Sequence, residues 1–207
     1  LPPYQTASGC TDIILHTMER YFIKENNMDI TDGFAESLMR TVMKHTRILM
    51  KEPNNYESRA EVMWAGSLSH NDITGSRSFG DWACHQLEHE LSGMYKVAHG
   101  AGLAAVWGSW ARYVYQEQPS RFAQYARNVM GIREENDVEC ALAGIEATEQ
   151  FFKEIGMPTS IHEMGITLCE EDIRKLAWKC SFEDERTIGC FKVLKKEDME
   201  NIYRIAK

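Results

Sequence analysis

The chain has 207 residues, of which 43% are hydrophobic and 10% aromatic, and it carries a formal net charge of −8. This length and composition are typical of a protein that buries a core of its own, which excludes a disordered segment. The negative charge argues against nucleic acid as a partner, because binding to phosphates relies on Lys and Arg. No apolar run approaches the ~18 residues that span a bilayer, so no membrane partner is expected.

The cysteines and the first residues of the chain indicate its compartment. No basic stretch followed by an apolar run opens the sequence, as a secretory signal would require. The six cysteines are far apart and include no C-x-x-C pair, which favours reduced thiols over a disulfide scaffold. We therefore expect a cytoplasmic protein with reduced, mostly buried cysteines.

Apolar residues recur at helical spacing along most of the chain. In the first predicted helix, for example, Ile14 and Met18 lie four positions apart. Thr31 is expected to cap the second helix, and Asn54 or Asn55 the third. The predicted helices cover residues 8–25, 30–52, 55–70, 101–117, 120–131, 137–156, 169–180 and 195–206, with a Gly- and Ser-containing loop at 72–80.

The pattern predicts an all-α fold, because no strand pair and no internal repeat is recognisable. We expect residues 1–207 to form a single multi-helix domain, with the last ~30 residues as a small appendage. Trp82, Trp107 and Trp110 could line an apolar pocket, but aromatic residues at helical spacing more often belong to a core.

The stretch HQLEHELSGMYKVAHG, residues 85–100, contains three of the seven histidines. His85 and His89 lie four positions apart on a predicted helix and share one face. With Glu88 they match the H-x-x-E-H pattern, in which two histidines bind zinc and the glutamate is the base of a peptidase. They equally suit half of a site whose other ligands come from another helix.

A second pair of candidate ligands, Asp12 and His16, lies near the start of the chain, again four positions apart. An aspartate among apolar neighbours needs a charged or metal partner, although near a helix start it also suits the macrodipole without a ligand. His99 begins a predicted helix, where unpaired N–H groups disfavour a protonated ring, and a neutral imidazole can bind a cation. These residues offer one carboxylate and several imidazoles from three helices, but spacing does not decide between His85 and His89.

These motifs together resemble the iron-dependent alcohol dehydrogenase family. The D-x-x-x-H pair, H-x-x-x-H and A-H-G-x-G-L-A, within GDWACHQLEHELSGMYKVAHGAGLA, are most similar to its butanol dehydrogenase-like branch, which uses NAD(P)H. The similarity runs over essentially the whole chain and implies the helical, metal-binding C-terminal domain of the enzyme. The metal ligands that it implies are Asp12, His16, His85 and His99. It also implies that His89 is not a ligand but faces the nicotinamide and the substrate, where it helps to move a proton.

The same resemblance implies the chemistry of the whole enzyme. The metal would be Fe(II), with Zn(II) able to replace it, and it would act as a Lewis acid on the oxygen of an aldehyde or a primary alcohol. A hydride would pass between NAD(P)H and that substrate. The cofactor would be bound by an N-terminal α/β nucleotide-binding domain, and we expect the intact enzyme to be a homodimer.

The chain lacks the glycine-rich turn that binds the pyrophosphate of a dinucleotide. In HGAGLA and the residue after it, Ala105 stands where G-x-G-x-x-G requires its third glycine, and no strand precedes the motif. We therefore expect this chain to be the C-terminal half of a dehydrogenase, which supplies the metal and substrate half of the site and is inactive alone.

Two other functions stay open from the residues themselves. One is a zinc peptidase that uses the H-x-x-E-H motif with Glu88 as base, which leaves the D-x-x-x-H pair without a role. The other is a metal-free helical interaction domain, whose histidines are structural. Of the remaining histidines, His70 is a candidate neighbour of the pocket, whereas His45 and His162 are expected to be solvated.

Overall fold

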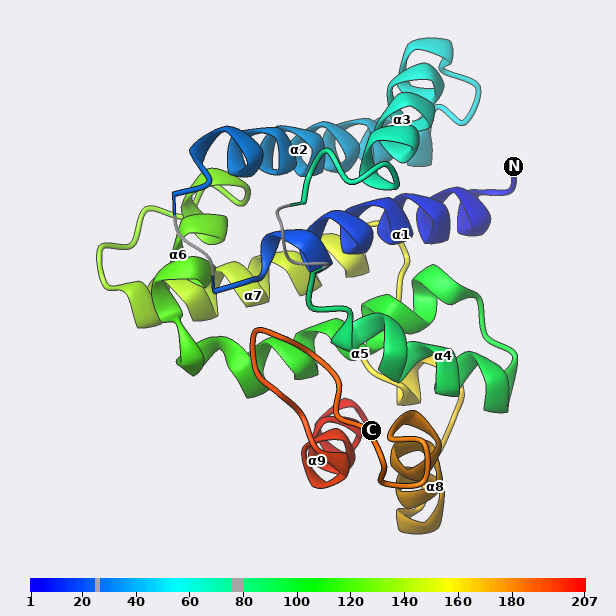
Figure 1. The fold of residues 1–207 in the computed structure, drawn as a ribbon. Helices are drawn as coiled ribbons and strands as arrows, with labels where there is room; N and C mark the ends of the chain where they lie inside the picture. Colours follow the sequence, from blue (N-terminus) through cyan, green and yellow to red (C-terminus); the bar gives the residue numbers. More distant parts are fainter. Residues whose placement is uncertain (25–26, 76–79) are drawn as a thin grey trace.

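The computed structural model describes residues 1–24, 27–75 and 80–207 (Figure 1). Its helices are α1 Pro3–Tyr21, α2 Asp29–Lys51, α3 Tyr56–Ser69, α4 Ala83–Tyr95, α5 His99–Val114, α6 Pro119–Asn128, α7 Asp137–Glu154, α8 Glu170–Cys180 and α9 Lys196–Ala206, with short 3-10 helices η1 Tyr115–Glu117 and η2 His162–Met164. In these residues the only β pairing is a single bridge between Ile188 and Leu194. The predicted all-α class is therefore confirmed.

Two of the predicted helix caps can be compared with the structure. The side chain of Asn55 accepts a hydrogen bond from the N–H of Ser58 at 3.0 Å, so this cap of α3 is confirmed. The prediction of Thr31 was wrong, because α2 begins at Asp29 with Met28 at the N-cap position. Two aspartates in the first turn of α2 interact favourably with the positive end of the helix, so α2 begins without a side-chain cap.

The first predicted helix, 8–25, and the predicted loop, 72–80, extend into residues 25–26 and 76–79, which lie outside the described residues. Within the described part, α1 begins earlier than predicted, at Pro3. Proline suits the first turn of a helix, because its missing N–H would have no partner there. The helix ends at Tyr21.

Helix α5 lies at the centre of the fold, with α1, α4, α7 and α9 packed against it. Every residue from 100 to 111 is buried, as is typical of a helix that is surrounded by others. Trp107 and Trp110 are fully buried here, which confirms that they belong to the core. A Cβ atom at Gly100 would overlap the carbonyl oxygen of Ser8, so this glycine lets the backbones of α5 and α1 approach closely.

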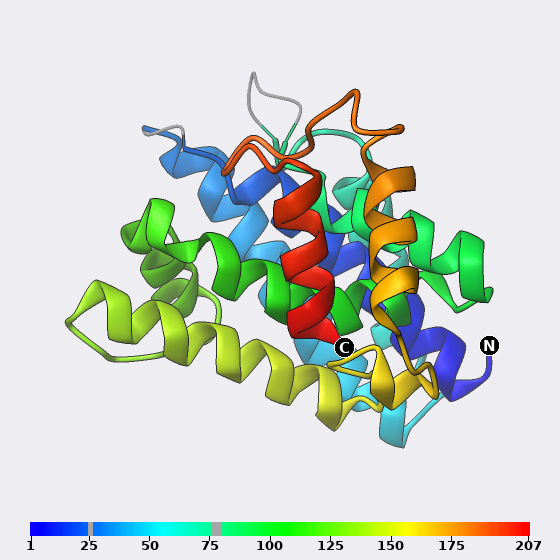
Figure 2. The ribbon, with the colours of Figure 1, turned by 90° about the horizontal axis from the view of Figure 1, so that it is seen from below.

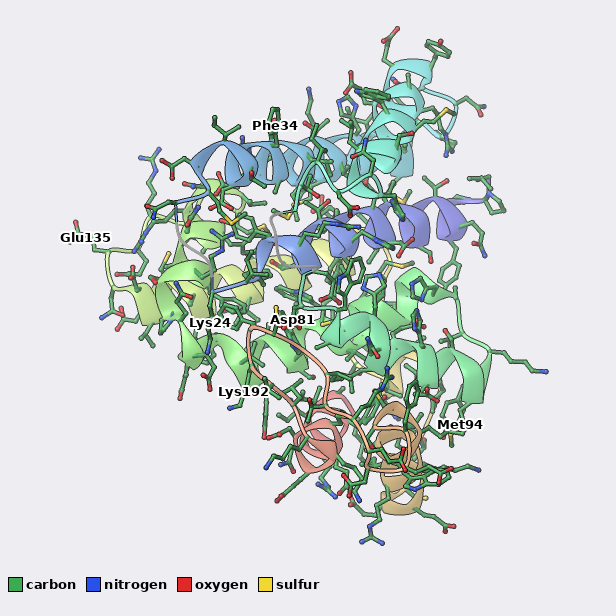
Figure 3. All side chains as sticks on the ribbon, in the orientation of Figure 1. Lys24, Phe34, Asp81, Met94, Glu135 and Lys192 are labelled. Atoms are coloured by element: carbon green, nitrogen blue, oxygen red, sulfur yellow. The ribbon has the colours of Figure 1, made fainter. Side chains whose placement is uncertain are left out.

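The last two helices pack against the part of the chain that is rich in histidines. In Figure 2, α8 and α9 lie side by side, and they contact α4 and α5 respectively. The hydroxyl of Tyr203 donates to the carbonyl oxygen of Leu87 at 2.7 Å. Asp81, labelled in Figure 3, accepts from the N–H groups of Cys190 and Phe191 at 2.8 and 2.7 Å. These bonds hold the C-terminal segment against the beginning of α4.

The predictions on membrane-spanning segments and on the cysteines can also be compared with the structure. Among the described residues, no helix is long and apolar enough to cross a bilayer. Cys10, Cys84, Cys140 and Cys180 are buried, whereas Cys169 and Cys190 are exposed, so most of the cysteines are buried, as predicted.

Candidate metal centre

The candidate ligands meet where α1, α4 and α5 converge. Asp12 and His16 lie on α1, His85 on α4, and His99 is the first residue of α5. The Oδ1 atom of Asp12 lies 3.6 Å from Nε2 of His16, 3.7 Å from Nε2 of His85 and 3.4 Å from Nε2 of His99. The carboxylate oxygen therefore has three imidazole nitrogens around it, although the residues are up to 87 positions apart in the sequence.

Several of these polar atoms are buried without a hydrogen-bond partner. They include Oδ1 of Asp12, Nδ1 of His16 and Nε2 of His85. Buried polar atoms in proteins are almost always hydrogen-bonded, because leaving one unpaired costs free energy. Distances of 3.4–3.7 Å between Oδ1 of Asp12 and the three Nε2 atoms are too long for hydrogen bonds, so Oδ1 of Asp12 and Nε2 of His85 face each other without bonding directly.

The spacing fits a metal ion between the side chains. An ion with bonds of about 2.1 Å to four tetrahedral ligands separates neighbouring ligand atoms by about 3.4 Å. The distances from Asp12 to the three histidines are close to that value. One carboxylate and three imidazoles are a donor set that suits Fe(II) or Zn(II).

Ionisation at the site also suits a cation. Burial, and then the charge of His85, lower the pKa of His16 to about 3, so this ring is neutral at pH 7. Burial opposes ionisation of Asp12, but the neighbouring histidines outweigh it and hold the pKa of that carboxyl below its usual value. Burial also lowers the pKa of His85, but the carboxylates of Asp12 and Glu19 outweigh it and raise the pKa to about 9. A metal must therefore displace a proton from His85.

Two glutamates are hydrogen-bonded to the Nδ1 atoms of His85 and His99, the ring nitrogens that do not face Asp12. The Oε1 atom of Glu19 lies 2.9 Å from Nδ1 of His85 and accepts from its backbone N–H at 2.9 Å. Glu88 accepts from Nδ1 of His99 and from the hydroxyl of Ser92. The sequence analysis missed Glu19, although it lies on the same face of α1 as His16, three positions further along. A carboxylate on the buried face of a helix was the signal that could have identified it.

The structure gives no support to the peptidase alternative. Glu88 is 0% exposed, and its two oxygens are bonded to His99 and Ser92, so it is not available to activate a water molecule. His85 is 4% exposed, whereas His89 is exposed and its ring centroid lies 6.2 Å from that of His85. Asp12, His16 and His85 form one possible ligand group by mutual distance, and Glu88, His89 and His99 form a second. Because the carboxylate there bonds to Nδ1 of His99, it leaves the Nε2 atom of that ring facing Asp12.

A cavity of about 450 Å³ opens beside the histidines. It is lined by His16, Trp82, His85, Gln86, His89, Glu90, His99, Phe182 and Arg186. His89 stacks on His99, with 5.4 Å between ring centroids, and burial, followed by the charge of His99, lowers the pKa of His89. Trp82 caps α4 with a left-handed backbone, φ 61°, a conformation that is uncommon for a bulky residue and is found at functional sites. Trp82 therefore lines the pocket, and the preference for a core position was wrong for this residue.

The other three histidines lie elsewhere or at the margin. The ring of His70 packs against that of His16 in a tilted arrangement, with 3.8 Å between ring centroids, so it does approach the site. His162 is exposed, as predicted. The prediction of a solvated His45 was wrong, because this residue is half-buried and its Nδ1 atom lies 3.0 Å from the hydroxyl of Ser58. That bond joins α2 to α3.

Comparison with known proteins extends the result from the site to the whole chain. Residues 6–207 match the family model described as "Fe-containing alcohol dehydrogenase family, C-terminal". The chain belongs to this family. The predicted resemblance is therefore confirmed, and so is the assignment to the C-terminal part of the family.

Relatives with known names agree with this membership. NADH-dependent butanol dehydrogenase A of Clostridium acetobutylicum is 34% identical over 206 residues, which cover 99% of this chain and 52% of that protein. NADPH-dependent aldehyde reductase YqhD of Escherichia coli is 37% identical over 166 residues, 80% of this chain and 43% of that protein. The solved structure of NADH-dependent butanol dehydrogenase A from Thermotoga maritima matches with a TM-score of 0.93 at 37% identity, covering 100% of this chain and 53% of its own. The chain thus spans about half the length of the relatives that it matches.

Proposed function

We propose that this chain is the metal-holding half of an NAD(P)H-dependent dehydrogenase that interconverts aldehydes and primary alcohols. Its relatives, which are named as butanol dehydrogenases and an aldehyde reductase, support this activity. The observation that carries the proposal is the Oδ1 atom of Asp12, which is buried without a hydrogen-bond partner among three imidazole nitrogens within 3.7 Å. Fe(II), or Zn(II) in its place, would be held by Asp12, His16, His85 and His99.

The residues around the cavity have distinct tasks in this proposal. When bound, the metal supplies Lewis acidity toward the substrate oxygen, and NAD(P)H supplies the hydride. Trp82 and Phe182 give the cavity apolar walls against which an alkyl chain can pack. His89 faces the same cavity and has a lowered pKa, so it is neutral at pH 7. It can accept and pass on a proton at its ring nitrogens beside the substrate and the nicotinamide.

The proposal includes a nucleotide-binding domain as the partner of this chain. The chain matches about half of each relative's length, and its H-G-x-G glycines serve helix packing rather than a phosphate turn. Residues 1–207 would then act as one helical domain beside that partner. A homodimeric assembly and a cytoplasmic location are further parts of the proposal and stay predictions.

Two alanine variants of α4 test the proposal. They are made in the full-length natural protein, including the proposed nucleotide-binding domain. We expect His85→Ala to lose its metal, because the variant lacks one of four proposed ligands. His89→Ala is the matched control, because it removes an imidazole one turn away that is not a proposed ligand. It should keep its metal and reduce aldehydes at least about 100-fold more slowly, since the proton-transfer group is gone. Elemental analysis and NAD(P)H oxidation measure the two effects.

The same pair of variants separates the alternatives. Equal loss of metal in His85→Ala and His89→Ala would favour the H-x-x-E-H peptidase site instead. Wild-type protein that binds neither Fe(II) nor Zn(II) would favour the metal-free interaction domain. Metal retained in His89→Ala with unchanged aldehyde reduction would contradict only the proposed role of His89.

A further inference from the structure

The two buried glutamates behind the site determine which nitrogen of each histidine is available. A neutral imidazole carries its proton on one nitrogen and a lone pair on the other. A carboxylate can only accept, so Glu19 and Glu88 each require a proton on the Nδ1 atom that they face. The lone pair then lies on Nε2. The Nε2 atoms of His85 and His99 are the ones that lie 3.7 and 3.4 Å from Oδ1 of Asp12.

We propose that Glu19 and Glu88 are positioning residues, which hold His85 and His99 as Nδ1–H tautomers with Nε2 directed at the metal. The inference rests on the proposed metal centre and adds two residues that do not touch the ion. Glu19 reaches from α1 to α4, and Glu88 reaches from α4 to α5. The two carboxylates therefore also align the three helices that carry the ligands. Carboxylates in this position increase the basicity of a ligand histidine, and losing one typically costs about 10–100-fold in metal affinity.

The burial of both glutamates shows that the arrangement is built into the fold. Glu19 is 2% exposed and Glu88 is 0% exposed, and a buried carboxylate is costly unless it is paired. Space for Glu88 depends on Gly102, since a Cβ atom there would lie 2.5 Å from Oε1 of Glu88. The second glycine of A-H-G-x-G-L-A thus has a physical reason, because it leaves room for the carboxylate that bonds to His99.

The third histidine differs from the other two. The Nδ1 atom of His16 is buried and has no hydrogen-bond partner. Its ring is positioned by packing against the rings of His70 and Trp82, with centroids 3.8 and 5.4 Å away. The positioning role therefore applies to His85 and His99, and we expect no tautomer control of this kind at His16.

Zinc affinity of the variants Glu19→Gln and Glu88→Gln tests the inference, measured by competition with a chelating dye. The amide keeps the shape of the carboxylate but adds an NH₂ donor, which can bond to a bare Nδ1 and favour the tautomer that cannot bind through Nε2. We expect zinc binding roughly 10–100-fold weaker in each variant. Glu36→Gln is the matched control, because Glu36 is also a buried carboxylate but bonds to Tyr21 and Gln124. Its zinc affinity should equal that of the wild type.

NMR of the wild-type protein with nitrogen-labelled histidine gives a second measurement that needs no variant to fold. In the zinc-loaded protein, we expect a proton on Nδ1 and zinc on Nε2 of both His85 and His99. Zinc on Nδ1, or wild-type affinity in both glutamine variants, would overturn the positioning role while leaving the metal centre intact. A wild-type protein that binds no zinc would overturn the proposed metal centre, and this inference with it.

Discussion

Two polar clusters lie along α1, and they differ in whether their groups are paired. The closed cluster surrounds the C-terminal end of α1. There Arg121 donates to both oxygens of Asp32 and to the carbonyl oxygen of Tyr21. Glu36 accepts from the hydroxyl of Tyr21 and from Gln124, at 2.8 and 3.1 Å. This cluster joins α1, α2 and α6.

The open cluster consists of the four candidate ligands, and its groups converge without bonding. The Oδ1 atom of Asp12 and the Nε2 atom of His85 are buried and have no hydrogen-bond partner. Both clusters contain an acidic side chain, which is buried at Asp32 and half-buried at Asp12, so the presence of a carboxylate alone does not distinguish them. A cluster whose polar atoms are all paired stabilises the contact between helices, whereas unpaired atoms directed at one point indicate a ligand.

The largest effect is expected from a substitution in the closed cluster, and it is a loss of stability. Asp32→Ala leaves the buried Arg121 without its carboxylate partner. Removing one member of a buried ion pair typically costs 3–5 kcal/mol, so we expect the free energy of unfolding to fall by about that amount. Urea unfolding with a chelator present measures it. The zinc affinity of the folded variant should not change, and a loss of zinc binding would show that the two clusters are coupled.

The converse substitution, Asp12→Ala, should affect metal binding and destabilise the metal-free fold less than Asp32→Ala does. Binding of structural zinc is worth about 10–16 kcal/mol, or about 3 kcal/mol for each of four ligands, and each 1.4 kcal/mol is a factor of ten. We therefore expect zinc affinity to fall by about 100-fold or more. Competition with a chelator and urea unfolding of the metal-free protein check both parts. A metal-free variant destabilised as much as Asp32→Ala would contradict the distinction between the clusters.

Local sequence pattern was enough to predict most helices and to pair candidate ligands on single helix faces, whereas the four-residue ligand set was implied by the family resemblance. The spacing of apolar residues depends only on the helical period, so it can be read without knowing the tertiary structure. Asp12 with His16, and His85 with His89, are each pairs on one helix face. What spacing did not decide was the choice between His85 and His89, which came from the resemblance. In the structure the first is buried and the second is exposed to the cavity.

The residues that the sequence analysis missed act through contacts between helices. Glu19 bonds to a histidine 66 positions away, and Gly102 matters because of its distance to Glu88. The pocket wall at Trp82 depends on a left-handed backbone, and the exposure of His45 depends on Ser58 of the next helix. Glu19 could have been identified as a carboxylate on the buried face of a helix, but none of these contacts leaves a periodic signal, so a single sequence cannot predict the partner of each residue.

The smallest expected effect concerns pH, and a rise in pH lowers the stability of the metal-free protein while it raises the affinity for zinc. The pKa of His85 is raised from 6.5 to about 9 in the folded, metal-free chain, by Asp12 and Glu19 against the effect of burial. Between these values the folded protein holds a proton that the unfolded chain has released, so stability falls as pH rises. The contribution is fully present below pH 6.5 and is lost through pH 9. Zinc displaces the same proton, so zinc affinity should rise over this range, by at most about tenfold per pH unit.

Thermal melts at about pH 7.5 and about pH 8.5, with and without zinc, measure this difference. The lower pH is chosen above the range in which Asp81 titrates. Burial and the charge of Glu19 raise the pKa of that carboxyl to about 7. That carboxyl keeps its proton longer in the folded state, so its stabilisation is lost as pH rises through 7 and changes little above it. We expect the gap between the melting temperatures of the zinc-loaded and metal-free forms to widen with pH. Glu19→Gln removes one of the two carboxylates that raise the pKa of His85, so the pH dependence of its metal-free form should be weaker. A gap that is constant with pH in the wild type would mean that zinc displaces no proton from His85.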